Sequence, residues 1–144
     1  HEIAAEGGTA LLIDEAYNAN PASMRATLAQ LARTEGRRRI AVLGAMKELG
    51  DHAPGYHAAL AAPLAESGAD YAIIVGDEMA SLAEELGKGA AGALGKALPF
   101  AHCAAPAEAL AALRAYGLER GDVILVKGSN SVGLGSVVAA LRDA

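Results

Sequence analysis

Polar side chains that could bind a ligand follow an apolar run near the start of the chain. Asp14 and Glu15 are adjacent there, so their side chains point to opposite faces of a strand and only one can reach a given ligand. Asp14 could instead bond a neighbouring backbone amide. Tyr17 could stack on a base, or it could be buried with its hydroxyl bonded. Asn20 precedes Pro21, which predicts a helix start, because Asn is a favoured N-cap and Pro suits the first helical position.

A second candidate stretch, residues 44–50, follows another apolar run and is bounded by glycines. The glycines permit close approach of the backbone to a ligand, and Lys47 and Glu48 offer opposite charges. Lys47 could bind a phosphate and Glu48 an ammonium group, or the two could be a solvated pair on a mobile loop. This loop would lie beside the first one if their two strands are neighbours in a sheet.

A third candidate stretch, residues 127–131, ends the last apolar run and precedes a helix. The N-terminus of a helix favours an anion, so a phosphate or a carboxylate could dock there, with Lys127 adding charge. Ser129 or Ser131 is expected to cap that helix through its hydroxyl.

Short apolar runs alternate with amphipathic segments along the chain, and these elements must position the candidate residues. Predicted strands cover residues 10–14, 39–43, 71–75, 100–103 and 122–127, and predicted helices cover residues 21–35, 56–67, 77–86, 106–116 and 132–141. Residues 1–9 are either a short first strand or the end of an interdomain linker, and residues 44–55 and 87–96 are predicted loops. This alternation indicates an α/β domain of three layers (α/β/α), with a mostly parallel sheet of five to six strands.

The composition limits the classes of function. The chain has 144 residues and a net charge of −5, which fits one domain, placed at residues 10–144. The largest basic cluster is residues 37–39 and no apolar run is long enough for a membrane span, so neither nucleic-acid binding nor a span is expected. Cys103 is expected to be a small buried residue, and a single cysteine without a signal peptide favours the cytoplasm. His52 and His57 lack the spacing of a metal site on one helix face, so no metal ligand is assigned.

Three stretches carry a resemblance to a known family. Residues 14–21, Asp-Glu-Ala-Tyr-Asn-Ala-Asn-Pro, resemble the Tyr-Asn-Ala-Asn-Pro motif that opens the C-terminal domain of the Mur ligase family. Residues 42–50 and 126–129 agree with later motifs of that domain and occur in the same order, so the resemblance spans nearly the whole chain. The sequence departs from the commoner pattern at Glu15 (often Asp), Ala16 (often Ser), Ala45 (often Asp) and Asn130 (often Arg).

The resemblance implies a Rossmann-like domain that closes over the central ATP-binding domain of the same ligase. It is nearest to the member that joins D-alanyl-D-alanine to UDP-N-acetylmuramoyl-tripeptide through an acyl-phosphate. In that family ATP and Mg²⁺ are bound mainly by the central domain, and the UDP-sugar mainly by the N-terminal domain, so both domains are implied partners. This chain contains neither and begins at His1 rather than Met, so we expect a part of a longer ligase that is catalytically inactive alone.

The resemblance also assigns the candidate residues to two sides of a site. The ATP side comprises Glu15, Tyr17, Asn18 and Asn20. The substrate or phosphate side comprises Lys47, Glu48, Lys127 and Ser129. For Asn20 the capping role is favoured over direct ligand contact, and no catalytic residue or metal ligand is assigned within this domain.

Two other functions remain open at this point. One is a stand-alone Rossmann-type nucleotide-binding or regulatory module, which would bind its ligand tightly without a second domain. The other is a Mur ligase that takes a single amino acid. Such a relative should carry His at the position of Asn18 and an Asn-Pro-Arg signature, and this sequence has neither.

Overall fold

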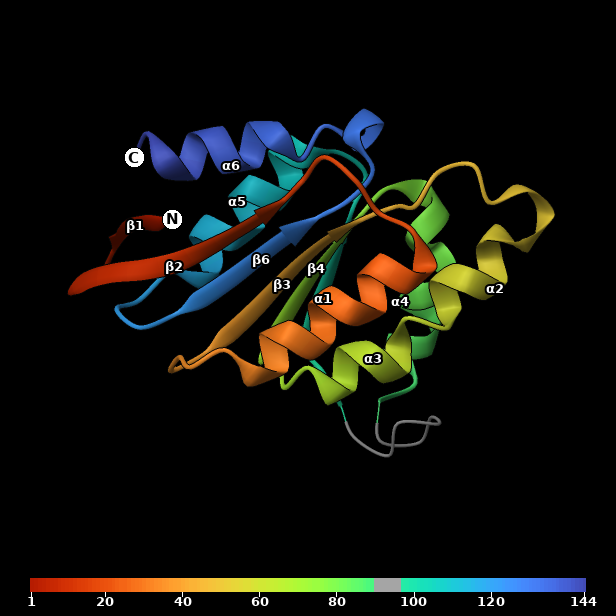
Figure 1. Cartoon of the computed structure of the whole chain (residues 1–144), viewed down its shortest axis with the longest axis horizontal. Helices are drawn as coiled ribbons and strands as arrows, with labels where there is room; N and C mark the ends of the chain where they lie inside the picture. The colour runs from red at the N-terminus through yellow and green to blue at the C-terminus, as the bar shows by residue number, and fades with distance from the viewer. Residues whose placement is uncertain (90–96) are drawn as a thin grey trace.

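A six-stranded sheet with helices on both faces is the centre of the computed structural model, which describes residues 1–89 and 97–144 (Figure 1). The strands are β1 (Glu2–Ala5), β2 (Gly8–Glu15), β3 (Arg39–Gly44), β4 (Tyr71–Val75), β5 (Phe100–Cys103) and β6 (Val123–Lys127). They lie in the order β1-β2-β6-β3-β4-β5. Every neighbouring pair is parallel except β1 and β2, which are antiparallel. The sheet confirms the predicted α/β class and its mostly parallel character.

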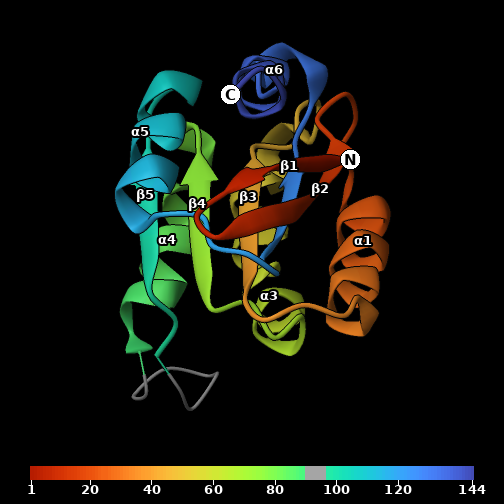
Figure 2. The same ribbon diagram turned by 90° about the vertical axis from the view of Figure 1, so that its left-hand side faces the viewer.

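Six α-helices and three short 3₁₀ turns lie between or after the strands in the described part of the chain. The helices are α1 (Pro21–Arg33), α2 (Ala53–Ala58), α3 (Ala61–Glu66), α4 (Ala80–Gly87), α5 (Pro106–Tyr116) and α6 (Gly135–Arg142), and the turns are η1 (Gly50–His52), η2 (Asp77–Met79) and η4 (Asn130–Val132). The two views in Figures 1 and 2 place α1, α3 and α4 on one face of the sheet and α5 and α6 on the other. None of the helices within residues 1–89 and 97–144 has the length and apolar character that crossing a bilayer requires.

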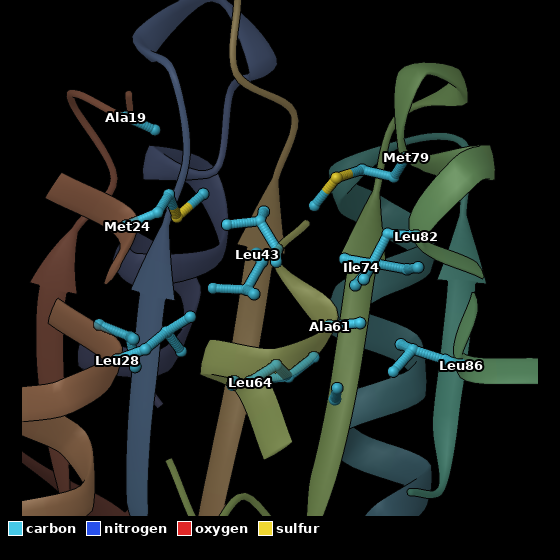
Figure 3. Packing of buried hydrophobic residues seen from close by; sticks show 14 of the residues in the cluster. Ala19, Met24, Leu28, Leu43, Ala61, Leu64, Ile74, Met79, Leu82 and Leu86 are labelled. Carbon is cyan, nitrogen blue, oxygen red and sulfur yellow. The ribbon is translucent and has the colours of Figure 1, made fainter. Parts of the chain in front are cut away.

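Two apolar layers, one on each face, form the core. In β3, Ala41 and Leu43 pack in the layer beneath α1, α3 and α4, whereas Ile40 and Val42 pack in the layer beneath α5 and α6. The first layer, shown in Figure 3, includes Met24, Leu28, Leu64, Ile74, Leu82 and Leu86. Because successive side chains of a strand point to opposite faces, a strand that is covered on both sides must be apolar throughout.

The first residues of the chain form a hairpin at the edge of the sheet. β1 pairs with β2 from Glu2 opposite Leu11 to Ala5 opposite Gly8, and Gly7 in the turn has a φ of 82°. A positive φ is accessible to glycine at little cost because it has no Cβ. This pairing explains why β2 begins earlier than the predicted strand 10–14.

The predicted helix 56–67 is instead two short helices, α2 and α3, and the first of them begins at Ala53, directly after the turn η1 and inside the predicted loop 44–55. Pro54 lies in the first turn of α2, which is a position that proline favours. Pro63 has no amide hydrogen to donate to the carbonyl of Ala59, so a continuous helix would lose a bond there. The predicted loop 87–96 falls largely on residues 90–96, which lie outside the described residues, and Gly87 ends α4.

The prediction that Ser129 or Ser131 caps the last helix is wrong. α6 begins at Gly135, with Leu134 at the N-cap position and no side-chain cap bond. The chain first makes the turn η4, where Ser129 is the N-cap residue but its side chain forms no cap bond. Gly133 then takes a left-handed conformation with φ 86°, and this reversal delays the start of the helix.

An ion pair between the partly exposed Arg38 and the buried Asp122 joins the amino ends of β3 and β6. Arg38 donates from Nε to Asp122 Oδ1 at 2.9 Å and from Nη2 to Oδ2 at 2.6 Å, and its guanidinium lies 4.5 Å from the ring centre of Tyr116. Burial alone would raise the pKa of Asp122, but hydrogen bonds from Arg38 and from the Glu119 amide outweigh it, so the net pKa is lowered. Arg38, in the middle of the arginine cluster at residues 37–39, therefore supports the fold.

Candidate functional site

The loops that carry the predicted site residues leave one edge of the sheet (Figure 1). In the strand register Lys127 lies beside Glu15 of β2 on one side and Leu43 of β3 on the other. The loop after β6 therefore lies between the loop after β2 and the loop after β3. The first two candidate stretches would have been adjacent only if β2 and β3 were neighbours, and they are not. In parallel sheets ligands bind at this carboxyl edge.

In the loop after β2, the carboxylates of Asp14 and Glu15 accept hydrogen bonds from residues of the loop itself. Asp14 Oδ1 accepts from the Ala16 amide at 3.1 Å, which is the amide-capping role considered for it. Tyr17 is exposed and donates from its hydroxyl to Glu15 Oε2 at 2.7 Å. That hydrogen bond and the negative charge of Glu15 raise the pKa of Tyr17. The alternative of a buried Tyr17 is therefore wrong, and both Glu15 and the tyrosine ring are available to a ligand.

Asn20 occupies the N-cap position of α1. Its Oδ1 accepts from the Ser23 amide at 2.9 Å, and the Ser23 hydroxyl accepts from the Asn20 amide at 3.0 Å. The two bonds form a capping box, which satisfies amides that have no partner inside the helix. The predicted cap is confirmed, while a ligand contact of Asn20 stays a prediction.

Lys127 is a buried cation at the floor of this region, with 3% of its surface exposed. Its Nζ donates to the Asn18 carbonyl at 2.9 Å and so joins the end of β6 to the loop after β2. Burial lowers the pKa of Lys127, and the nearby charge of Glu15 opposes that shift. An ammonium group has three donors, and this contact uses one of them.

These groups line one cleft of about 320 Å³ between the end of β2, the end of β6 and α1. Its lining residues are Glu15, Tyr17, Asn18, Ser23, Ala26, Thr27, Gln30 and Lys127. The structure thus brings together three predicted ATP-side residues and one that had been placed on the phosphate side. Ser23, Thr27 and Gln30 were missed, although their spacing of four and three residues puts them on one face of a helix.

The loop after β3 is held through its backbone. The Ala45 amide donates to the Val75 carbonyl at 3.1 Å, and the Lys47 amide donates to Ser129 Oγ at 3.0 Å. Glu48 follows with a φ of 63°, an uncommon conformation for a residue with a Cβ. Ser129 therefore positions Lys47 in place of capping a helix.

Lys47 and Glu48 do not pair with each other. The Lys47 ammonium donates to the carboxylate of Glu78, which lies in η2 after β4. This hydrogen bond, followed by one to the backbone, lowers the pKa of Glu78. Both partners are exposed, so the bond is one that a ligand could replace. The Glu48 carboxylate is exposed as well, and no hydrogen bond or ion pair of it is found among the described residues.

His57 differs most from its predicted position. Sequence periodicity put Tyr56 on the apolar face and His57 on the flank, but Tyr56 is exposed and His57 is fully buried. His57 Nε2 accepts from the Met46 amide at 2.9 Å, and its Nδ1 lies 2.8 Å from the Ala53 carbonyl. Burial is the main cause that lowers the pKa of His57. This side chain attaches α2 to the loop that carries Lys47.

The glycines at the edge serve backbone packing. A Cβ on Gly128 would lie 3.0 Å from the Gly44 Cα, and a Cβ on Gly44 would lie 2.8 Å from the Leu134 Cδ1. The loops after β3 and β6 can approach this closely only without side chains. Gly44 thus packs against the end of β6, whereas the sequence analysis had suggested that it makes room for a ligand.

The described residues do not form a metal site of their own. Within residues 1–89 and 97–144 no group of three or more His, Cys, Asp or Glu side chains is close enough to hold an ion. Cys103 is free and buried as predicted, and burial raises the pKa of its thiol.

Comparison with known proteins agrees with the motifs. The UDP-N-acetylmuramoyl-tripeptide–D-alanyl-D-alanine ligase of Synechocystis sp. is 38% identical over 135 residues, which are 94% of this chain but only 28% of that ligase. MurF from Acinetobacter baumannii has a TM-score of 0.76 at 29% identity, over 94% of this chain and 28% of that one. MurF ligase from Thermotoga maritima in complex with ADP has a TM-score of 0.74 at 24% identity, over 99% of this chain and 30% of that one, which bears on the fold alone. The family model described as Mur ligase, glutamate ligase domain matches residues 2–130, and the chain therefore belongs to the Mur ligase family.

Proposed function

We propose that this chain is the C-terminal domain of the ligase that joins D-alanyl-D-alanine to UDP-N-acetylmuramoyl-tripeptide with ATP. The observation that carries the proposal is the cleft in which Lys127 meets Glu15, Tyr17 and Asn18. It is supported by the 38% identity with a relative of that name. The central and N-terminal domains of the ligase would be its partners, because this chain spans under a third of that relative.

On the nucleotide side, three groups have chemistry that suits ATP. Glu15 already accepts from a hydroxyl, that of Tyr17, and it could accept from the hydroxyls of a ribose in the same way. The exposed ring of Tyr17 offers a face for a base. Lys127 retains donors for a nucleotide oxygen after its bond to the Asn18 carbonyl. Mg²⁺ would be bound mainly by the central domain.

On the substrate side, the loop after β3 presents two opposite charges that are held in place. Glu48 has an exposed carboxylate without a partner among the described residues, which suits the ammonium group of D-alanyl-D-alanine. Lys47 and Ser129 suit a carboxylate or a phosphate, and Lys47 would exchange Glu78 for that ligand. Once the ammonium group of the dipeptide has lost a proton to solvent, the amine would attack the acyl carbon of the tripeptide's acyl-phosphate as the domain closes, forming the amide bond and releasing phosphate. Aligning two reactants and excluding water can supply much of a rate gain.

A titration of backbone amide signals by NMR tests this proposal. The isolated chain receives Mg-ATP and then D-alanyl-D-alanine, first alone and then with the upstream domains added in trans. We expect small shifts confined to residues 14–20, 44–50 and 127–131, which become larger when the upstream domains are present, and no ligation by this chain alone. Tight saturable binding of ATP by the chain alone would instead identify a stand-alone nucleotide-binding module. Ligation by the chain alone would contradict the closing role.

The cytoplasm is the location that this proposal implies. A reducing compartment is consistent with a single cysteine, Cys103, which is free and buried. Measuring the ligase in fractionated cells would test this expectation, and recovery of the ligase outside the cytoplasmic fraction would contradict it.

A further inference from the structure

The buried imidazole of His57 has a defined protonation state. The Met46 amide can only donate, so Nε2 must carry the lone pair at this 2.9 Å contact. The proton of a neutral ring then lies on Nδ1, which donates to the Ala53 carbonyl at 2.8 Å. Both ring nitrogens are used, with opposite roles, and a protonated imidazole could no longer accept from Met46.

The Met46 amide, whose hydrogen bond His57 accepts, belongs to the segment that presents Lys47 and Glu48. Ala45, Met46 and Lys47 are consecutive, and their amides donate to three different parts of the fold: Val75 of β4, His57 of α2 and Ser129 after β6. Glu48, with its φ of 63°, comes directly after them. Such a conformation persists only where the surroundings fix it.

We propose that His57 is a positioning residue for the amine side of the ligase, acting through the Met46 amide on Lys47 and Glu48. This inference rests on the proposed function. An apolar side chain would fill the same buried space but would leave the Met46 amide without a partner, so packing alone does not account for a histidine here. His57 has no role in the nucleotide cleft, whose lining comes from β2, β6 and α1.

The charges that act on the imidazole come from the two segments packed beside it. They are Glu78 of η2 and Lys47 of the loop after β3, whose effects on the pKa of His57 are opposite in sign. These two side chains pair with each other. The ordinary pKa of histidine is 6.5, and because burial lowers it in the folded chain, the accepting form is present throughout the neutral range.

Two substitutions separate positioning from packing. His57→Gln retains an acceptor oxygen, whereas His57→Phe fills the space without one, and His52→Gln changes an exposed histidine of the preceding turn as a matched control. The amide signals of residues 45–48 and the long-range ¹H–¹⁵N signals of the imidazole are recorded on this chain. Steady-state kinetics are recorded on the complete ligase that contains it, with KM measured separately for D-alanyl-D-alanine and for ATP.

We expect the wild-type spectrum to show the neutral Nδ1–H tautomer. His57→Phe should shift the signals of residues 45–48 and raise the KM for D-alanyl-D-alanine by about 10-fold or more, with the KM for ATP unchanged. His57→Gln should restore part of both, and His52→Gln should change neither. A chain in which His57→Phe leaves these amide signals and the dipeptide KM at wild-type values would overturn the inference.

If His57→Phe does not fold, His57→Gln and the wild-type tautomer still decide the matter. If the His57 variant that folds has the wild-type KM for D-alanyl-D-alanine, the positioning role is rejected while the proposed function stays intact. If the complete wild-type ligase does not use D-alanyl-D-alanine at all, both the proposed function and the positioning role are rejected. The NMR data would then show only that His57 holds the loop after β3 in place.

Discussion

Replacing Lys127 by methionine should weaken nucleotide binding without destabilising the fold. The substitution keeps an unbranched stem of similar size and removes the ammonium of a residue that is only 3% exposed. It therefore deletes the bond from Nζ to the Asn18 carbonyl and the charge that lies beside Glu15. The position of Lys127 in the β2–β6–β3 register is otherwise unchanged.

The two effects on stability are of opposite sign and similar size. Losing a hydrogen bond from a charged donor costs about 1.5–3 kcal/mol. Removing a buried charge returns an amount of the same order, since taking an ion out of water is costly and its burial lowers the pKa of Lys127. Asn18 is exposed, so water can satisfy its carbonyl. We expect the free energy of unfolding to change by less than about 1 kcal/mol.

For ATP binding, the loss of the Lys127 ammonium is not offset in this way. If Lys127 donates to an oxygen of ATP, its loss removes about 1.5–3 kcal/mol, or roughly 10- to 150-fold in affinity. Urea unfolding of this chain measures the first quantity, and the KM for ATP of the complete ligase measures the second. Lys88→Met, which removes an exposed lysine paired with Glu85, is the matched control and should change neither.

Two results would refute this reasoning. A loss of stability above about 2 kcal/mol in Lys127→Met would show that the ammonium is a structural tie between β6 and the loop after β2. An unchanged KM for ATP together with unchanged stability would show that it does not contact the nucleotide.

Three further predictions concern the fold. Asp122→Ala should lower the free energy of unfolding by about 3 kcal/mol, because it leaves Arg38 without its carboxylate. In the wild type this contribution is present above pH 3.8 and is lost as the pH falls through the lowered pKa of Asp122. An acid titration followed by circular dichroism measures that loss. Asn20→Ala should cost about 1 kcal/mol by urea unfolding, since it removes the acceptor of the capping box. Gly128→Ala should lower the free energy of unfolding by about 1–3 kcal/mol. Gly135→Ala, where a Cβ meets nothing within 4 Å, should instead stabilise α6 by up to about 1 kcal/mol. Equal effects of the two substitutions would contradict the role given to backbone contact at the strand ends.

Local patterns were sufficient to locate the strands. Each predicted parallel strand agrees with the structure to within two residues at either end, because a strand covered on both faces is a continuous apolar run that ends at glycine or a polar residue. The order of the strands was not predictable. β6 pairs with both β2 and β3, and such pairing between distant segments depends on crossover geometry that periodicity along the chain does not encode.

The error at His57 has a local physical cause. The buried positions His57, Leu60, Ala61 and Leu64 have the spacing i, i+3, i+4 and i+7, which is one face of a helix. Tyr56 lies beside that face and is exposed. The prediction placed the face one residue too early, because it counted the aromatic Tyr56 as an apolar position and the polar His57 as a flanking one.

The candidate site was only partly predictable for a different reason. Glu15, Tyr17, Asn18 and Lys127 meet in one cleft because strand ends gather at one edge, which follows from the fold class. The partner of Lys47 does not follow from it. Glu78 comes from the loop after β4, and the contact depends on the strand order.

The two edges of the sheet differ in what their residues do for folding. At the amino edge Arg38 and Asp122 bond to each other, so these two charges have a structural explanation. At the carboxyl edge Lys127 is buried beside a single carbonyl, and Glu48 holds a left-handed backbone with its carboxylate exposed. Burying the charge of Lys127 has a desolvation cost that its hydrogen bond only offsets, and a left-handed backbone at a residue with a Cβ costs free energy; proteins retain such features where function requires them. The argument that this edge binds ligands thus rests on its energetic costs as well as on its motifs, and the stability of Lys127→Met tests that argument directly.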